Sequence, residues 1–390
     1  MVATANAEPI RTRERPEWLQ NLGPQVVALV LALAFALGVG SLIIIAYGEN
    51  PLTVYRAIVS FSFSSTDNLA RMLTIATPLI FSALAVTVCF KAAMFNIGVE
   101  GQYLVAMVTA SVAALHLGFL GPFQFIAVLA FGMLGGMIWA AIPAVLKVKT
   151  GAHEVVTTIM LNGIAVSFVA WALNGPIKYT KQAGGFNVDL RTDYFPKGAL
   201  MPNLGHLFGV NSAVALTWLL PLGVVAAALV WFLLKRMRLG YEARAVGSSA
   251  GSAHAGGISI GSVQIKMFLI SGALAGLVGM QQILGENGYF PQNYEAQLGF
   301  TGIAVAFLGQ NNPFGILAAA VLWAVLSRGE DAIQIETSVP RELIIILQAI
   351  LILAVVISYS VAKRRIARRQ LRAAAVQGQD FEDSDTEEAA

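Results

Sequence analysis

Residues 238–266 read RLGYEARAVGSSAGSAHAGGISIGSVQIK. This is the longest polar, small-residue segment that lies between two strongly apolar runs on the side of the membrane where the basic clusters are expected. Its first part carries Arg238, Glu242 and Arg244, and its middle consists of Gly, Ser and Ala. Such a segment cannot cross a bilayer, because charged residues there are costly, and it is too short to form a domain. We therefore expect a short amphipathic helix, closed by glycines, that presses against something outside the membrane. The alternative is a loop that merely covers the inner surface.

The rest of the chain is strongly apolar. Hydrophobic residues make up 57% of the 390 residues and charged residues only 12%, whereas a soluble domain has about 25% charged residues. Many apolar runs are about 20 residues long, which is the length of a transmembrane helix. The runs are continuous rather than alternating, which favours helices over a closed barrel. The sequence predicts an all-α polytopic membrane protein whose first apolar run is retained rather than cleaved.

Ten membrane spans are predicted, with a moderately apolar segment at 49–66 placed as an amphipathic helix on the outer surface. The eighth span is short and is a candidate half-helix. The predicted spans are residues 25–46, 69–90, 100–117, 122–146, 155–174, 213–234, 264–284, 297–310, 314–328 and 342–361.

Basic residues predict the orientation, because cytoplasmic loops are enriched in Lys and Arg. With ten spans, every basic cluster falls on the side of both termini; nine or eleven spans would place one cluster outside. The expected organisation is a cytoplasmic segment at 1–24, a membrane domain at 25–361 and a basic-then-acidic tail at 362–390. Within the domain, 175–212 is an extracytoplasmic loop and 238–263 a cytoplasmic loop. The expected location is a prokaryotic cell membrane.

Two glycine-containing stretches in the two halves of the chain are similar. FNIGVEGQ occupies residues 95–102, and GFTGIAVAFLG occupies 299–309 in the corresponding part of the second half. They indicate an inverted repeat of the kind found in many transporters.

Glu100 lies in the first of these stretches, with Asn96 and Gln102 beside it. A carboxylate among apolar residues is costly in lipid and suggests a function. On one interpretation this segment lines or gates a substrate path. On the other, Glu100 caps the N-terminus of the third span, where the helix dipole favours an anion.

Other polar side chains in the spans are few. Asn162, Gln281 and Gln282 could hydrogen-bond a polar solute, and they could equally bond across helices. The four histidines show no metal-ligand spacing, and the chain contains no Gly-x-x-x-x-Gly-Lys-Ser/Thr loop for ATP phosphates. We expect no catalytic residue, metal, cofactor or nucleic-acid partner.

Several ordered motifs between Leu69 and Gly329 resemble ABC-importer permeases for simple sugars, nucleosides and branched-chain amino acids. They are ATPLIFSALAV, FNIGVEGQ, GAHEVVTTIMLN, GYEARAVGSSAGSAHAGGISI and GFTGIAVAFLGQNNPFG. The resemblance implies a ten-helix permease that pairs with a second, usually non-identical permease. It also implies two cytoplasmic ATPase chains and a substrate-binding lipoprotein or periplasmic protein. The chain's length and the 175–212 loop look like the larger permease of a nucleoside system.

The same resemblance implies that the loop at 238–263 touches the ATPase. The expected contact residues are Tyr241, Glu242, Arg244, Ala245, Gly247, His254, Gly256 and Gly257, with Glu242 and Arg244 fixing the register through ion pairs. At 248–253 the chain departs from many relatives, which carry an Asn and an Ala-Ala pair there.

The function that follows is ATP-driven import of a nucleoside or simple sugar. The alternative is an ion-coupled secondary transporter of a small polar solute. That class uses carboxylates at mid-membrane, for which Glu100 is the one candidate.

Overall fold

The computed structural model describes residues 17–178, 190–211, 214–336, 340, 342–355 and 357–358, with side chains from residue 30 onward. The tail at 362–390, most of the segment at 1–24, part of the 175–212 loop and the end of the predicted span 342–361 lie outside the described residues.

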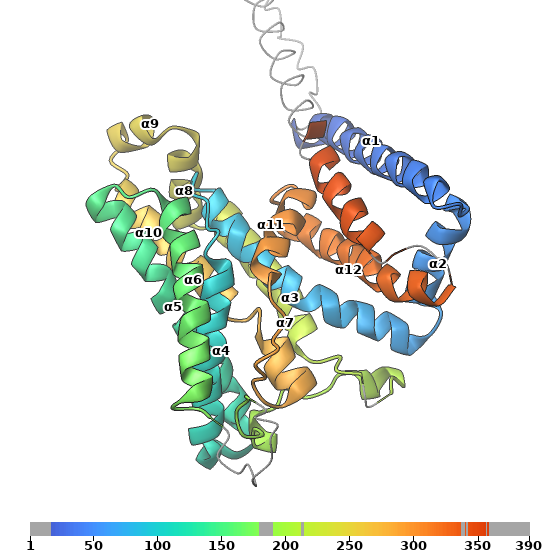
Figure 1. The fold of residues 1–390 in the computed structure, drawn as a ribbon. Helices are drawn as coiled ribbons and strands as arrows, with labels where there is room; N and C mark the ends of the chain where they lie inside the picture. Colours follow the sequence, from blue (N-terminus) through green and yellow to red (C-terminus); the bar gives the residue numbers. More distant parts are fainter. Residues whose placement is uncertain are drawn as a thin grey trace, which may run out of the picture. The chain divides into compact units, whose positions relative to one another are not determined.

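The described chain is almost entirely helical, which confirms the predicted all-α class (Figure 1). Only two isolated β-bridges occur among these residues, Arg191 with Pro291 and Asn203 with Thr217. The helices are α1 (Glu17–Ala46), α2 (Pro51–Phe63), α3 (Thr66–Phe90), α4 (Val99–His116), α5 (Gln124–Thr150), α6 (Glu154–Asn174), α7 (Leu219–Arg236), α8 (Arg238–Ser248), α9 (Ala250–Ala255), α10 (Ile260–Ala275), α11 (Leu298–Leu308) and α12 (Pro313–Glu336). A further helix covers Glu342–Val355, and a π-helix covers Gln281–Asn287.

Local sequence signals set the ends of these helices. Asn50 begins α2 by accepting a hydrogen bond from the N–H of Leu52 at 2.9 Å, and Ser65 begins α3 by accepting from Asn68 at 3.1 Å. Such side chains satisfy backbone donors that the first turn leaves unpaired. α5 ends at Gly151, which has a φ of 71° that glycine adopts at little cost.

α3 and α4 form the centre of the unit that spans residues 43–348. Every residue from 76 to 89 and from 99 to 108 is buried. α3 packs against α7, α10, α11 and α12, while α4 packs against α5 and α6, and these three lie side by side in Figure 1. The two central helices are therefore surrounded by protein, and the outer helices carry the exposed apolar faces.

The contact between α5 and α10 is made by glycines from both helices. A Cβ added at Gly136 would lie 2.3 Å from the carbonyl oxygen of Gly272, and one added at Gly276 would lie 2.4 Å from that of Gly132. Small residues at this spacing let helix backbones approach closely in a membrane. The two Gly-xxx-Gly faces, Gly132/Gly136 and Gly272/Gly276, pack on each other.

The number of membrane spans is not settled by helix length and composition. Among the described residues, four helices are long and apolar enough to cross a membrane, or six if each of two bent pairs counts as one span. α11 has 11 residues and is about 16 Å long, roughly half of the hydrocarbon thickness. The chain bends by 118° between α11 and α12. The short length and the bend are both consistent with the predicted half-helix at 297–310. The ten-span arrangement stays a prediction.

Candidate functional site

Glu100 joins two helices that are distant in sequence. Its Oε1 accepts the backbone N–H of Gln297 at 2.8 Å, and its Oε2 accepts that of Gly299 at 2.9 Å. These donors lie at the start of α11. A carboxylate there satisfies unpaired N–H groups and complements the positive end of the helix dipole. Glu100 thus caps α11, whereas the capping interpretation drawn from the sequence assigned it to its own helix.

The approach of the two helices depends on Gly299. A Cβ at this position would lie 2.4 Å from the backbone nitrogen of Glu100, so a side chain would push α11 away from α4. The hydroxyl of Tyr103 lies 3.0 Å from Glu100 Oε1 and 3.0 Å from the carbonyl oxygen of Glu295, and can donate its proton to either. The junction therefore combines charge, close packing and a shared hydroxyl.

Asn96 and Gln102 form a buried amide pair next to Glu100. The Nδ2 of Asn96 donates to Gln102 Oε1 at 3.0 Å and to Ser271 Oγ at 2.9 Å, and Gln102 Nε2 donates back to Asn96 Oδ1 at 3.0 Å. Ser271 in turn donates to the carbonyl oxygen of Ala85 at 2.6 Å. These bonds tie the turn before α4 to α10 and α3.

Asn162 holds the same turn from α6. Its Oδ1 accepts the N–H of Gly101 at 2.9 Å, and its Nδ2 donates to the carbonyl oxygen of Ile97 at 3.1 Å. Both side-chain groups bond to backbone atoms of the segment that contains Glu100. The structure thus brings Asn96, Glu100 and Gln102 together with Asn162.

Gln281 and Gln282 lie on the π-helix. Gln281 donates to the carbonyl oxygen of Ala215 at 2.6 Å and accepts the Thr217 hydroxyl at 2.7 Å. Gln282 accepts the N–H of Glu295 at 3.1 Å, and the carbonyl of that residue is the one beside Tyr103. Gln282 is therefore linked to the Glu100 junction through Glu295, which the sequence analysis did not single out.

The segment 238–266 contains two short helices, α8 and α9, where one was expected, and its last residues begin α10. Ser249 interrupts the helix with an extended backbone, φ −158° and ψ 107°, and its Oγ accepts the N–H of Ser252 at 3.3 Å. Serine is favoured at such a position because its hydroxyl replaces the missing backbone acceptor. Gly257, with a φ of 78°, follows α9, so glycine does close the segment as expected.

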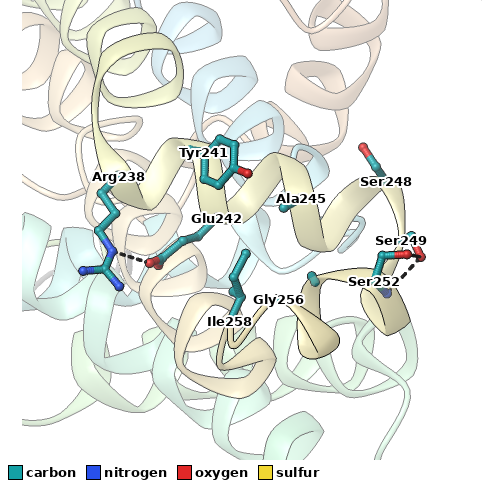
Figure 2. A pocket seen from close by; sticks show the side chains of 10 residues that line it. Arg238, Tyr241, Glu242, Ala245, Ser248, Ser249, Ser252, Gly256 and Ile258 are labelled. Carbon is teal, nitrogen blue, oxygen red and sulfur yellow. Dashed lines mark hydrogen bonds and ion pairs between the residues drawn. The ribbon is translucent and has the colours of Figure 1, made fainter.

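The two helices border a groove with a volume of about 490 Å³ (Figure 2). Of the predicted ATPase contacts, Tyr241, Glu242, Ala245 and Gly256 line it. The side chain of Tyr241 is 63% exposed. This groove is exposed, partly polar and bounded by small residues, which suits it to receive a side chain or helix of another protein.

Within this chain, Glu242 and Arg244 have different surroundings. Glu242 pairs with Arg238 at 2.7 Å within α8, one turn earlier. Among the residues that the structure describes, Arg244 forms no ion pair, and its Nη1 is buried without a hydrogen-bond partner. The α8 pair is of the exposed i,i+4 type, which contributes only about 0.3–0.5 kcal/mol. The ion pair therefore adds little to the stability of α8.

Glycines anchor α8 to the membrane helices. A Cβ at Gly240 would lie 2.0 Å from the carbonyl oxygen of Leu233 in α7, and one at Gly247 would lie 2.4 Å from that of Lys91 at the end of α3. α8 therefore packs directly on the ends of α3 and α7. His254 and Gly257 lie at or after the end of α9.

Sequence analysis overlooked three charged residues around a second cavity: Arg71, Glu286 and Arg328. A signal was present, since Arg71 and Arg328 fall inside predicted spans, where charge is rare. No group of three or more His, Cys, Asp or Glu side chains suited to a metal occurs within the described part of the chain.

Comparison with known proteins gives one family and several relatives. The sequence model of the branched-chain amino acid transport system / permease component matches residues 68–356. A glucose ABC transporter permease protein of Haloferax volcanii is 30% identical over 91% of this chain and 92% of its own length. A guanosine ABC transporter permease protein of Bacillus subtilis is 33% identical over 88% and 95%. A nucleoside ABC transporter permease protein of Lactococcus lactis is 28% identical over 87% and 93%.

Proposed function

This chain belongs to the family of branched-chain amino acid transport system permease components, and on that premise we propose that it translocates a nucleoside or simple sugar, driven by ATP hydrolysis on a separate subunit. The observation that carries the proposal is similarity over nearly the whole chain to permeases named for guanosine, nucleosides and glucose. A nucleoside and a simple sugar share hydroxyl-rich rings, which neutral polar side chains suit.

The proposed partners are a cytoplasmic ABC ATPase, a second and non-identical permease, and an extracytoplasmic binding lipoprotein. The α8–α9 groove is the proposed ATPase contact. Its support is that the segment lies on the basic side of the predicted topology and that four of the expected contact residues line the groove (Figure 2). Both termini are proposed to be cytoplasmic.

The proposed mechanism is alternating access. Closure of the ATPase dimer displaces α8, and Gly240 and Gly247 pass this displacement to α7 and α3. α3 packs on α11, whose start is held by Glu100. The junction of Glu100 with α11 is therefore the proposed point at which helix movement opens or closes the path.

Asn96, Gln102, Asn162, Gln281 and Gln282 are proposed to border this path. In the described conformation their side chains bond to other groups of the protein. Their proposed role is to stabilise this one conformation, and to exchange these bonds for bonds to the solute when the helices move.

The test is uptake of tritiated guanosine and of labelled glucose by cells that produce the complete transporter. We expect uptake of one of these solutes that stops when the phosphate-loop lysine of the ATPase subunit is replaced. Uptake that continues without a functional ATPase and follows a sodium or proton gradient would instead support the ion-coupled alternative.

A further inference from the structure

A second cavity has a volume of about 530 Å³. It is bordered by the start of α3, the C-terminal half of α12 and the end of the π-helix. The predicted topology assigns this end of the molecule to the exterior. Its polar lining comes from four separate segments: Arg71, Thr74, Asn203, Glu286 and Arg328. Nothing in the established family assignment gives these residues a role.

The two arginines differ in what they already bind. Arg328 forms an ion pair with Asp331 and donates to Asn68 Oδ1 at 3.4 Å, and its guanidinium carbon lies 5.1 Å from the centre of the Phe61 ring. Arg71 is exposed and has no hydrogen bond or ion pair to any described residue. Arg328 is held in place, whereas Arg71 retains its five donors for a ligand.

Glu286 provides the cavity with a carboxylate that can accept hydrogen bonds from a ligand. It lies just beyond the seventh predicted span, and burial together with the nearby Glu295 carboxylate raises its pKa to about 7, against the opposing effect of a hydrogen bond from Gln281. A ligand that donates hydrogen bonds to the carboxylate would favour its ionised form. A carboxylate can accept two such bonds in parallel.

The neutral walls are fixed by their own hydrogen bonds. The carbonyl oxygen of Ala215 accepts Gln281 Nε2 at 2.6 Å. Asn203 donates to the carbonyl oxygen of Val214 at 2.9 Å and accepts the N–H of Gly205 at 2.6 Å. A site whose walls are held in this way loses little entropy when a ligand binds.

We propose that this cavity binds the ribose ring of an incoming nucleoside, with Glu286 accepting hydrogen bonds from the vicinal 2′- and 3′-hydroxyls and Arg71 donating to ring or hydroxyl oxygens. A vicinal diol offers two donors at the spacing of the two carboxylate oxygens. A phosphate or carboxylate ligand fits less well, because Glu286 would repel it. The inference rests on the proposed function and names the part of the solute that this chain recognises.

Thiol labelling provides the first test. The one native cysteine, Cys89, is buried, so Ile75→Cys, on the cavity wall, gives the assembled transporter a reporter thiol in this chain. We expect a membrane-impermeant methanethiosulfonate to label it from outside, and guanosine to slow that labelling at least fivefold. 2′,3′-Dideoxyguanosine should have no effect. The control Lys197→Cys, on the exposed outer segment, should be labelled equally with and without guanosine.

Uptake provides the second test. Glu286→Gln and Arg71→Gln should each slow guanosine uptake about tenfold, the effect of losing a hydrogen bond to a charged group. Glu286→Gln should not slow dideoxyguanosine uptake, because that solute lacks both hydroxyls, and Lys197→Gln should leave the uptake of both solutes unchanged. Amounts of assembled transporter are measured in parallel to exclude misfolding.

The possible failures are distinguishable. If the wild-type transporter imports neither guanosine nor glucose in an ATP-dependent way, the proposed function fails. If it imports guanosine, the inference is overturned when the thiol of Ile75→Cys is not labelled or is not protected by guanosine. It is also overturned when Glu286→Gln slows the uptake of guanosine and of dideoxyguanosine equally. Import of glucose without guanosine overturns the assignment to ribose.

Discussion

The carboxylate of Glu100 and the backbone N–H of Gly299, which are 199 positions apart in the chain, lie 2.9 Å from each other. This bond joins the first turn of α4 to the first turn of α11, and the absence of a side chain at Gly299 makes it possible. The two glycine-containing stretches FNIGVEGQ and GFTGIAVAFLG therefore meet in space. Their similarity in sequence corresponds to a contact between the two halves of the protein.

Replacing Glu100 with Gln should destabilise this junction. The amide group would keep one acceptor oxygen and would place an N–H group against a backbone donor, at a cost of about 1–3 kcal/mol. We expect a lower Tm of the detergent-purified protein and slower uptake. For the Tm measurement, Glu295→Gln is the matched control, because that side chain is exposed and the network uses only the Glu295 backbone. An unchanged Tm for Glu100→Gln would show that Glu100 does not stabilise the start of α11.

Gly299→Ala should have a similar effect by a steric route. The new Cβ would lie 2.4 Å from the Glu100 nitrogen, and such overpacking costs about 1–3 kcal/mol. Gly163→Ala in α6 is the control, because nothing lies within 4 Å of a Cβ there, and alanine in a helix is favoured over glycine. The measurement is the difference in Tm between the two variants. Equal Tm values would show that the α4–α11 contact can relax.

Gly247→Ala should uncouple the proposed ATPase subunit from the membrane helices. Its Cβ would lie 2.4 Å from the Lys91 carbonyl oxygen at the end of α3, so α8 would shift on its support. We expect the ATPase to co-purify while solute-stimulated ATP hydrolysis falls severalfold. Gly251→Ala, in the same segment with open space around it, should behave as wild type. Normal stimulation in Gly247→Ala would argue against transmission through this contact.

Glu242→Lys should abolish co-purification with the ATPase or abolish uptake. The exchange also breaks the ion pair with Arg238, so the double variant Arg238→Glu/Glu242→Lys serves as the control, since it restores the pair with reversed order. We expect the double variant to remain defective, because the charge presented in the groove stays reversed. Recovery of uptake in the double variant would show that Glu242 acts only within α8. Unaltered co-purification and uptake in the single variant would exclude a role for Glu242 in the ATPase contact.

Guanosine uptake should increase as the external pH rises through about 7. The raised pKa of Glu286, about 7, means that its carboxyl is neutral below this pH and able to accept both hydroxyl donors above it. Arg71 and Arg328 are the other ionisable side chains that line this cavity, and Glu295 is the nearby carboxylate that raises the pKa of Glu286.

Two variants test this assignment. Glu286→Gln should flatten the pH profile near 7, and Glu295→Gln should move the midpoint to lower pH, because a like charge is removed. A profile that keeps its midpoint in Glu286→Gln would assign the titration to another group.

The sequence by itself determined the helices and their order. Apolar runs about 20 residues long, Asn50 and Ser65 at helix starts, and Gly151 after α5 are local signals, and the hydrogen bonds that they control close within a few residues. The two Gly-xxx-Gly spacings, Gly132/Gly136 and Gly272/Gly276, can be read in the sequence, whereas their packing on each other is a tertiary contact. Similarity of motifs identified the family, because several ordered motifs are far more specific than one.

Only the tertiary structure decided which groups face each other. The partner of Glu100 is at Gly299, the ion pair of Glu242 lies within its own helix, and four separate segments line the outer cavity. Such contacts depend on how helices distant in sequence pack, and periodicity along one helix does not encode that arrangement. The sequence marks Arg71 only as a charge inside a predicted span and does not mark Glu286, and the two become a candidate site because the fold places both on one cavity.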